Sequence, residues 1–221
     1  MAETQGFCES LSIYTAGVEA ELIHPTLIWD KETAILVDTG YDGQLELFRQ
    51  ATKALGVAFE RVAHIVLTHR DGDHILGLPA MVAALPAVEV LASEAEKPFV
   101  EAQKCPGPGR PAVRVTHTLV DGEELPYCGG VVVIATPGHQ PGHICLYHRP
   151  TRTLVPGDAL EIREDQLVGP NPHYTHDMAT AIRSLANITR YDVQRVLCYH
   201  GGPYTGNVAA RIAEIIRETP S

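Results

Sequence analysis

The stretch Thr68–Leu78, which reads THRDGDHILGL, contains two histidines and two aspartates within the six residues from His69 to His74. It follows the apolar run 64–67 (HIVL), a pattern typical of a buried strand. Imidazole nitrogens and carboxylate oxygens are the usual protein ligands of borderline divalent metal ions. The stretch therefore predicts a metal site where a buried strand opens into a loop.

The composition of the whole chain is that of an ordinary globular protein and limits its partners. The 221 residues are 45% hydrophobic and 20% charged, and the formal net charge is −10. The 17 lysines and arginines are scattered without a basic patch, which disfavours a nucleic-acid partner. No stretch approaches the ~20 apolar residues of a membrane span, and the N-terminus lacks a signal-peptide pattern. We therefore expect a cytoplasmic protein that acts on a small molecule and binds neither membranes nor nucleic acids.

The five cysteines are widely spaced and include no Cys-x-x-Cys pair, which fits reduced thiols better than a disulfide framework. They are Cys8, Cys105, Cys128, Cys145 and Cys198. We expect them to be buried and to act neither as metal ligands nor as nucleophiles.

The first half of the chain alternates between strand and helix patterns. Two apolar strands within 22–38 are joined by a polar turn, and an amphipathic helix then ends near Gly56. The pattern after Thr68 predicts a helix near Ile75 to Leu85, followed by a strand ending at Ser93. Ser93 and Glu96 have the spacing of a capping box, which predicts that they cap another helix.

A segment rich in glycine and proline, Cys105–Pro111, predicts a loop at the midpoint. After it the series begins again, with strands expected at 113–119, 131–136, 144–148, 153–158 and 195–200, and helices near 177–188 and 207–218. Either half alone, about 1–105 or 110–221, would leave a sheet face exposed. The order therefore predicts a single α/β domain, 1–221, in which two sheets pack together with helices on their outer faces.

Five of these apolar strands end in a histidine or an aspartate, namely Asp38, His69, His139, Asp158 and His200. A strand delivers its last residues into a loop at the rim of a sheet, so several such ends can converge on one place. A single histidine or aspartate after a strand is usually a turn or cap residue. Five in succession are better explained by one metal site.

At these positions the sequence resembles the metallo-β-lactamase superfamily. The signature of that family is His-x-His-x-Asp-His after a strand, followed by a distant histidine, a bridging aspartate and a last histidine. His69, Asp73 and His74 fill three of the four cluster positions, and the later motifs TPGH, PGD and YHGG supply His139, Asp158 and His200. The resemblance runs from Asp38 to Gly202. It implies a four-layer αβ/βα sandwich with the metal site at the rim of the sheets.

The resemblance also implies two divalent metal ions, with zinc as the first expectation. The implied ligands form two sets that share one bridging aspartate: His69, Asp71 and His139 for the first ion, Asp73, His74 and His200 for the second, and Asp158 between them. Asp38 matches the acidic residue that lies behind the site in that family.

Asp71 departs from the family, which usually has histidine at this position. A carboxylate is a harder donor than imidazole, so it should favour iron or manganese relative to zinc. Its shorter side chain would draw the first metal nearer the backbone or weaken its binding. The alternative is that Asp71 points outward or caps the helix beginning near Ile75, which would leave one metal at the second site.

Other histidines and one tyrosine have smaller expected roles. His143 is expected to support the loop that carries His139 by hydrogen bonding, without binding metal. Tyr174 lies in the segment GPNPHYTHD and is a candidate to border the substrate pocket and donate to a developing oxyanion. The histidines expected to be structural and away from the cluster are His24, His64, His117 and His148.

The function implied by the resemblance is hydrolysis of a small ester-like compound such as a thioester, a lactone or a lactam. A water bridging two dications would have its pKa lowered from ~15.7 to near ~7, and the resulting hydroxide would attack the substrate carbonyl. Asp73 would orient the hydroxide and pass a proton to the leaving group.

Three other functions remain open from the sequence. An iron-dependent oxidoreductase of the flavodiiron or sulfur-dioxygenase type is favoured by the Asp71 carboxylate. A phosphodiesterase is disfavoured by the acidic charge, and a non-catalytic metal-binding protein is disfavoured because every ligand position retains a donor.

Overall fold

The first of two six-stranded sheets is built from strands within residues 7–119. The computed structural model describes residues 6–15, 22–101 and 113–218. The strand order across this sheet is β1 (Phe7–Ser10), β4 (Thr26–Trp29), β5 (Ala34–Val37), β6 (Val62–Val66), β7 (Glu89–Ser93) and β8 (His117–Leu119). Strands β1, β4 and β5 pair antiparallel, whereas β5 to β8 pair parallel, so the sheet is mixed.

The second sheet is also mixed and is built from the later strands. Its order is β16 (Gly202–Tyr204), β15 (Arg195–Cys198), β12 (Thr153–Val155), β11 (Ile144–His148), β10 (Val131–Ala135) and β9 (Glu124–Leu125). Only β12 and β15 pair parallel. Two short ribbons accompany the sheets, β2 (Ile13–Tyr14) with β3 (Leu22–Ile23), and β13 (Glu161–Arg163) with β14 (Gln166–Val168).

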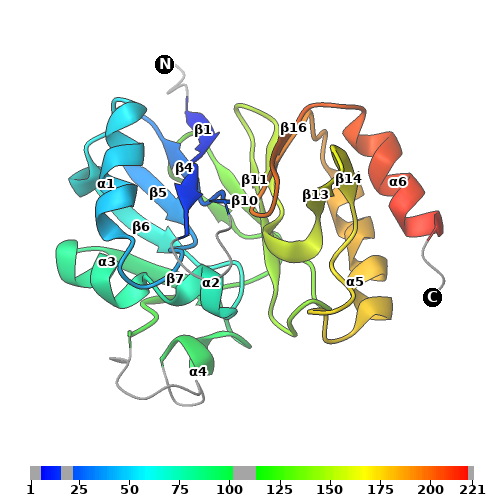
Figure 1. Ribbon diagram of the computed structural model, residues 1–221, viewed down its shortest axis with the longest axis horizontal. Coiled ribbons are helices and arrows are strands. Elements are labelled where there is room, and N and C mark those ends of the chain that lie inside the picture. Colours follow the sequence, from blue (N-terminus) through cyan, green and yellow to red (C-terminus); the bar gives the residue numbers. More distant parts are fainter. Residues whose placement is uncertain (1–5, 16–21, 102–112, 219–221) are drawn as a thin grey trace.

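Helices cover the outer face of each sheet (Figure 1). The outer face of the first sheet is covered by α1 (Leu45–Ala54) and α3 (Leu78–Ala84), and that of the second by α5 (Met178–Ser184) and α6 (Val208–Glu218). Two shorter helices, α2 (Gly72–Ile75) and α4 (Lys97–Val100), follow β6 and β7. Single turns of 3₁₀ helix lie at η1 (Phe59–Arg61) and η2 (Gly157–Ala159), and a longer one, η3 (Leu185–Arg190), continues α5. The predicted helix near 177–188 is therefore present, and its last part is the 3₁₀ segment.

The core explains why these strands are apolar on both faces. In β5, Ile35 and Val37 belong to the core between the two sheets, where they join Val133 and Leu146 of the second sheet. The alternate residue Leu36 belongs to a separate core under α1 and α3. A third core lies between the second sheet and α5, η3 and α6. Two sheets covered on both faces make four layers, which confirms the predicted αβ/βα sandwich.

The helix predicted near Ile75 to Leu85 is divided into two, α2 and α3. Pro79 lies in the first turn of α3 and has no N–H to continue the hydrogen bonds of α2. The Gly77 N–H instead bonds the Gly40 carbonyl at 2.9 Å, and a Cβ at Gly77 would lie 2.1 Å from the Thr39 carbonyl oxygen. The chain therefore bends to pack against the loop that follows β5.

The capping box predicted for Ser93 and Glu96 is wrong. The helix that follows, α4, has no side-chain cap bond. Both side chains bond Gly142 in the second half of the chain instead. The two side chains find their hydrogen-bond partner in a residue that is distant in sequence, and a local sequence pattern does not reveal such a partner.

The change from one sheet to the other occurs later than the predicted midpoint. The segment Cys105–Pro111 lies outside the described residues. The strand predicted at 113–119 is reduced to β8, and β8 pairs with β7 in the first sheet. The chain crosses to the second sheet between Leu119 and Glu124.

Four of the five cysteines are described, and all four are buried free thiols: Cys8, Cys128, Cys145 and Cys198. Burial raises the pKa of Cys128 and of Cys145 to about 12, so these thiols are protonated and poor nucleophiles at neutral pH. Cys105 lies outside the described residues. Within the described ranges, the helices are too short or too polar to traverse a lipid bilayer.

Candidate metal centre

The predicted ligands meet because the strands that carry them end at a common edge. Strands β5 and β6 are parallel neighbours in one sheet, and β12 and β15 are parallel neighbours in the other. Strand β10 runs antiparallel to β11, which runs antiparallel to β12, so β10 points the same way as β12. The loops after these five strands carry Asp38, His69, His139, Asp158 and His200.

The first group of candidate ligands consists of His69, His139 and Asp158, whose ligand atoms all lie within 4.8 Å of one another. The Asp158 Oδ2 atom lies 3.5 Å from His139 Nε2 and 3.9 Å from His69 Nε2. The Asp71 Oδ2 atom lies 3.0 Å from His139 Nε2 and 3.6 Å from His69 Nε2. Three donor side chains therefore converge, and Asp71 lies beside the two histidines among them.

The second group consists of Asp73, His74 and His200, again with ligand atoms within 4.8 Å of one another. The Asp73 Oδ2 atom lies 3.2 Å from His74 Nε2 and 3.3 Å from His200 Nε2. Asp158 also reaches this group, since its Oδ1 lies 3.2 Å from His74 Nε2 and its Oδ2 lies 3.6 Å from His200 Nε2. Asp158 is thus in contact with ligand atoms of both groups.

The chemistry of the buried atoms fits divalent cations. Among the described residues, His69 Nε2, His74 Nε2 and Asp158 Oδ1 are buried and have no hydrogen-bond partner, although each lies close to other donors of the site. A buried polar atom without a partner destabilises the fold, so such atoms usually bind a hydrogen-bonding group, a water or an ion. Imidazole nitrogens and carboxylate oxygens aimed at a shared point are suited to a cation of the zinc, iron or manganese type.

The carboxyl groups of the site are ionised at neutral pH. Burial acts to raise the pKa of Asp71, but its hydrogen bond with His139 and the nearby His69 imidazole outweigh it and hold the pKa below its usual range. Burial likewise opposes the lowering of the Asp158 pKa, which results mainly from the nearby imidazoles of His74 and His200. The anionic form that metal binding requires is therefore favoured.

The Asp71 side chain is directed into the site. Asp71 occupies the cap position of α2, but its side chain makes no cap bond there. Its Oδ1 accepts a hydrogen bond of 2.6 Å from Gln140 Nε2, which leaves Oδ2 facing His139. This geometry contradicts the alternative that Asp71 points outward or caps the helix. Ligation of a metal by Asp71 remains a prediction.

Asp38 holds one ligand in orientation from behind. It is buried, and its φ of 61° lies in the left-handed region that is uncommon for a residue with a side chain. It accepts hydrogen bonds of 2.8 Å from the Thr68 N–H and hydroxyl, and its Oδ2 lies 2.8 Å from His74 Nδ1. A proton on His74 Nδ1 leaves the Nε2 lone pair directed at the second group.

His143 is occupied by hydrogen bonds that exclude it from metal binding. Its Nε2 accepts from the Asp158 N–H at 3.0 Å, and its Nδ1 lies 2.9 Å from the Thr136 hydroxyl. Burial lowers the pKa of His143 well below its usual value, and the nearby His69 and His139 add to the effect. A neutral His143 thus fixes the backbone of the residue that both groups share.

Several supporting residues carry no signal in the sequence motifs. The Tyr199 hydroxyl donates to the Asp73 carbonyl at 2.5 Å, and its ring stacks on His74 with centroids 3.8 Å apart. The Thr175 hydroxyl lies 3.4 Å from His139 Nδ1. In the sequence, Tyr199 is marked by its position directly before His200 alone, and Thr175 by no motif.

The predictions for the remaining residues have mixed outcomes. His24 was expected to lie away from the cluster, and this is wrong, because its ring packs beside Gly202 and its pKa is lowered by burial and by the charge of His200. His64 pairs with Glu89, away from the two groups. Tyr174 is 72% exposed, in the same segment as Thr175.

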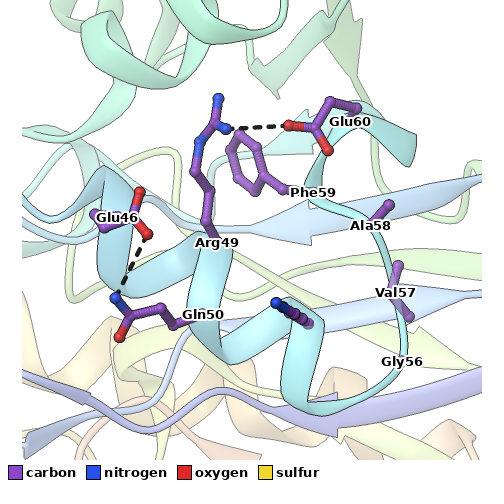
Figure 2. Close-up of a pocket in the computed structure, with 9 residues that line it drawn as sticks. Glu46, Arg49, Gln50, Gly56, Val57, Ala58, Phe59 and Glu60 are labelled. Carbon is purple, nitrogen blue, oxygen red and sulfur yellow. Dashed lines mark hydrogen bonds and ion pairs between the residues drawn. The ribbon is translucent and has the colours of Figure 1, made fainter.

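A wide groove lies on the outer face of the first half, distant in the fold from these ligands. It has a volume of about 730 Å³ and is lined by α1 and η1. Figure 2 shows Arg49 and Glu60 paired across it, with a separation of 3.2 Å, and Arg49 over the ring of Phe59. None of the candidate ligands lines this groove.

Comparison of the sequence with known proteins agrees with this geometry. The sequence profile described as Metallo-beta-lactamase superfamily matches residues 20–200. "Probable metallo-hydrolase YflN" of Bacillus subtilis (strain 168) is 27% identical in an alignment 220 residues long, which covers 85% of this chain and 83% of that protein. A hydroxyacylglutathione hydrolase of Hydrogenovibrio crunogenus is 32% identical over 151 residues, which are 68% of this chain and 49% of that enzyme. This chain matches about half the length of that enzyme.

Solved structures show the same fold. The metallo-beta-lactamase family protein TTHA1429 from Thermus thermophilus superposes with a TM-score of 0.74 at 24% identity, covering 96% of this chain and 78% of that one. A metallo-beta-lactamase from Pontibacter korlensis superposes with a TM-score of 0.73 at 18% identity, covering 99% of this chain and 98% of that one. The likeness extends over nearly the whole chain.

Proposed function

Because the chain belongs to the metallo-β-lactamase superfamily, we propose that it is a hydrolase of a small ester-like compound that works with two divalent metal ions. The observation that carries the proposal is the position of Asp158, whose two oxygens approach ligand atoms of both groups. A carboxylate shared in this way is suited to holding two cations side by side. If the protein bound a single metal ion, the buried ligand atoms of the other group would lack a cation.

The residues divide the work between them. His69, His139 and Asp158, with Asp71, would hold one ion, and Asp73, His74 and His200, again with Asp158, would hold the other. When bound, divalent ions would polarise the substrate carbonyl and lower the pKa of a water from ~15.7 to near ~7. Asp38 and His143 keep the ligands in place through their bonds to His74 and to the Asp158 backbone.

Asp73 is the residue proposed to move a proton. Its side chain is 19% exposed, whereas that of His74 is fully buried, so Asp73 lies on the open side of the second group. Burial acts to raise the pKa of Asp73, but the nearby imidazoles of His74 and His200 hold it below its usual range. An ionised carboxylate there can orient the attacking water and pass its proton to the leaving group.

The similarity to a hydroxyacylglutathione hydrolase supports a thioester as the first substrate class to test. A lactone or a lactam is the next, since both present a carbonyl that a water must attack. The net charge of −10 supports a small molecule over a nucleic acid as the substrate.

A metal-by-substrate screen tests the proposal. Chelator-treated protein would be reloaded with zinc, manganese or iron and assayed on thioester, ester, lactone, lactam and phosphodiester panels. We expect hydrolysis of a carbonyl substrate that a chelator abolishes. His69→Ala should lower the rate by more than the ~100-fold typical of losing a residue that only supports a ligand.

The matched control for this screen is His117→Ala, which removes an exposed histidine that pairs with Glu123. It should leave the rate unchanged. Cleavage that resists chelation, or that survives His69→Ala, would contradict the proposal.

An iron-dependent oxidoreductase is the second candidate, and the position of Asp71 favours it. Its Oδ2 lies 3.0 Å from His139 Nε2, so the first ion would gain a hard oxygen donor. Consumption of O₂ by iron-loaded protein with a thiol or a reductant, together with failure of every hydrolytic panel, would support this function over the first.

Asp71→His is expected to shift metal preference at the first group towards zinc. Imidazole is a softer donor than carboxylate, so the ratio of zinc to manganese affinity should rise about tenfold, or ~1.4 kcal/mol. Competitive titration of the two metals measures this ratio. Asp121→His, on an exposed carboxylate, is the control, and an unchanged ratio in Asp71→His would show that Asp71 does not bind the metal.

A further inference from the structure

Glu96 is a buried carboxylate that belongs to neither group of candidate ligands. It follows β7 at the start of α4, and its side chain is 0% exposed. Its Oε1 accepts a hydrogen bond of 2.9 Å from the Gly142 N–H, 46 residues further along the chain. A buried carboxylate requires such partners to offset its loss of water.

The same glycine is held from a second direction. The Ser93 hydroxyl donates to the Gly142 carbonyl at 2.6 Å, so both polar backbone groups of Gly142 bond the first half of the molecule. A Cβ at Gly142 would lie 2.5 Å from Ser93 Oγ and 2.7 Å from Glu96 Oε1. The close approach therefore depends on glycine at this position. Gly142 lies three residues after His139, in the loop that also contains Gln140.

Glu96 also contacts the segment that carries His69 and Asp71. Its Oε1 lies 3.7 Å from Arg70 Nη1, and the Arg70 guanidinium lies 3.7 Å from the centroid of the Phe99 ring. Arg70 is placed between His69 and Asp71 in the sequence. The backbone that carries these two residues is thereby fixed against α4.

We propose that Glu96 is a positioning residue that sets the spacing of the first group of ligands, by joining the His69–Asp71 segment to the loop of His139. This inference rests on the metal-binding function proposed above. It distinguishes the two groups, because the polar contacts given for the Glu96 side chain involve Arg70 and Gly142 and none of the ligands of the second group.

Titration of metal-free protein with Co²⁺ tests the proposal through binding, without any assay of activity. The wild-type protein is expected to bind two equivalents. Glu96→Ala should bind one equivalent with unchanged affinity and the other roughly 10- to 100-fold more weakly, the range typical of residues that orient metal ligands. The visible absorption of cobalt reports the altered ligand field of the weakened site.

Glu96→Gln is the rescuing variant. The glutamine amide keeps an oxygen that can accept from the Gly142 N–H, so its two affinities should stay within a few-fold of wild type. Asp30→Ala is the control for a general loss of stability. Asp30 is a buried carboxylate that accepts from the backbone of Glu32 and Thr33 in the β4–β5 turn, and its removal should lower the melting temperature without changing either affinity.

Two further variants assign the weakened equivalent to a group. In a His139→Ala background, where the first group is already damaged, Glu96→Ala should not weaken the remaining equivalent. In a His200→Ala background it should weaken the equivalent that remains. Equal weakening of both equivalents, or none, in a folded Glu96→Ala protein would overturn the proposal.

Ser93→Ala provides an independent test if Glu96→Ala does not fold. It removes one hydroxyl and its bond to the Gly142 carbonyl, and should weaken the same equivalent by a smaller factor. Unchanged binding in Ser93→Ala would overturn the proposal in that case. A wild-type protein that binds no cobalt would contradict the proposed function itself, which separates the two failures.

Discussion

Asp158→Ala is expected to lower kcat/KM by roughly 10³-fold and to reduce the bound metal from two equivalents to one or fewer. Its oxygens lie between 3.2 and 3.9 Å from imidazole nitrogens of both groups. Removing this side chain would deprive both cations of a shared anionic ligand at once. The loss of kcat/KM should therefore exceed the ~100-fold typical of a supporting residue. Metal analysis after dialysis and initial rates on the best substrate of the panel measure the two effects.

The control for Asp158→Ala is Asp192→Asn, which removes an exposed carboxylate paired with Arg152. Exposed pairs of this kind contribute ~0–1 kcal/mol, so neither metal content nor rate should change. Retention of two tightly bound equivalents in Asp158→Ala would show that this aspartate does not join the two groups.

Asp38→Asn is expected to weaken metal binding at the second group by roughly 10- to 100-fold. The Asp38 carboxylate accepts a hydrogen bond from the His74 Nδ1–H, whereas an asparagine NH₂ group would donate towards that nitrogen and favour the tautomer with its proton on Nε2. Asparagine tolerates the left-handed backbone at this position, so the variant should fold. Cobalt titration measures the affinity, and urea unfolding measures the stability.

Asp38→Ala separates orientation from folding. It removes all three hydrogen bonds that Asp38 accepts and should lower the free energy of unfolding by about 3 kcal/mol, because buried polar partners lose their acceptor. Asp30→Asn, in the β4–β5 turn, is the control and should leave cobalt affinity unchanged. An Asp38→Asn protein with wild-type affinity at both groups would contradict the orienting role.

The architecture could be predicted from the sequence because its signals are local. Apolar runs of strand length mark the buried strands, and the carboxyl ends of parallel strands meet at one edge. Asp38 and His69, which follow parallel neighbours in the first sheet, could therefore be placed near one another from the sequence, as could Asp158 and His200 of the second sheet. The resemblance to the metallo-β-lactamase superfamily implied the remaining positions of the centre and joined the two pairs in one site.

The contacts that hold the centre could not be predicted, because they join residues distant in sequence. Ser93 and Glu96 have the spacing of a helix cap, yet their partner is Gly142, in the other half of the molecule. The proximity of His24 to His200 likewise depends on the packing of the two sheets. A short sequence motif indicates which hydrogen bonds or metal contacts a residue can make. It does not identify the distant residue that serves as the partner.

The assembly of the centre from both halves has a consequence for folding. His69 and His74 come from the first half of the chain, and His139 and His200 from the second, so each bound ion would crosslink two otherwise separate layers of the sandwich. A ligand that binds only the native state adds RT ln(1 + [L]/Kd) to its stability, about 2.7 kcal/mol at 100 times Kd. The concentration of free metal would then set the resistance of the protein to unfolding as well as its rate of catalysis.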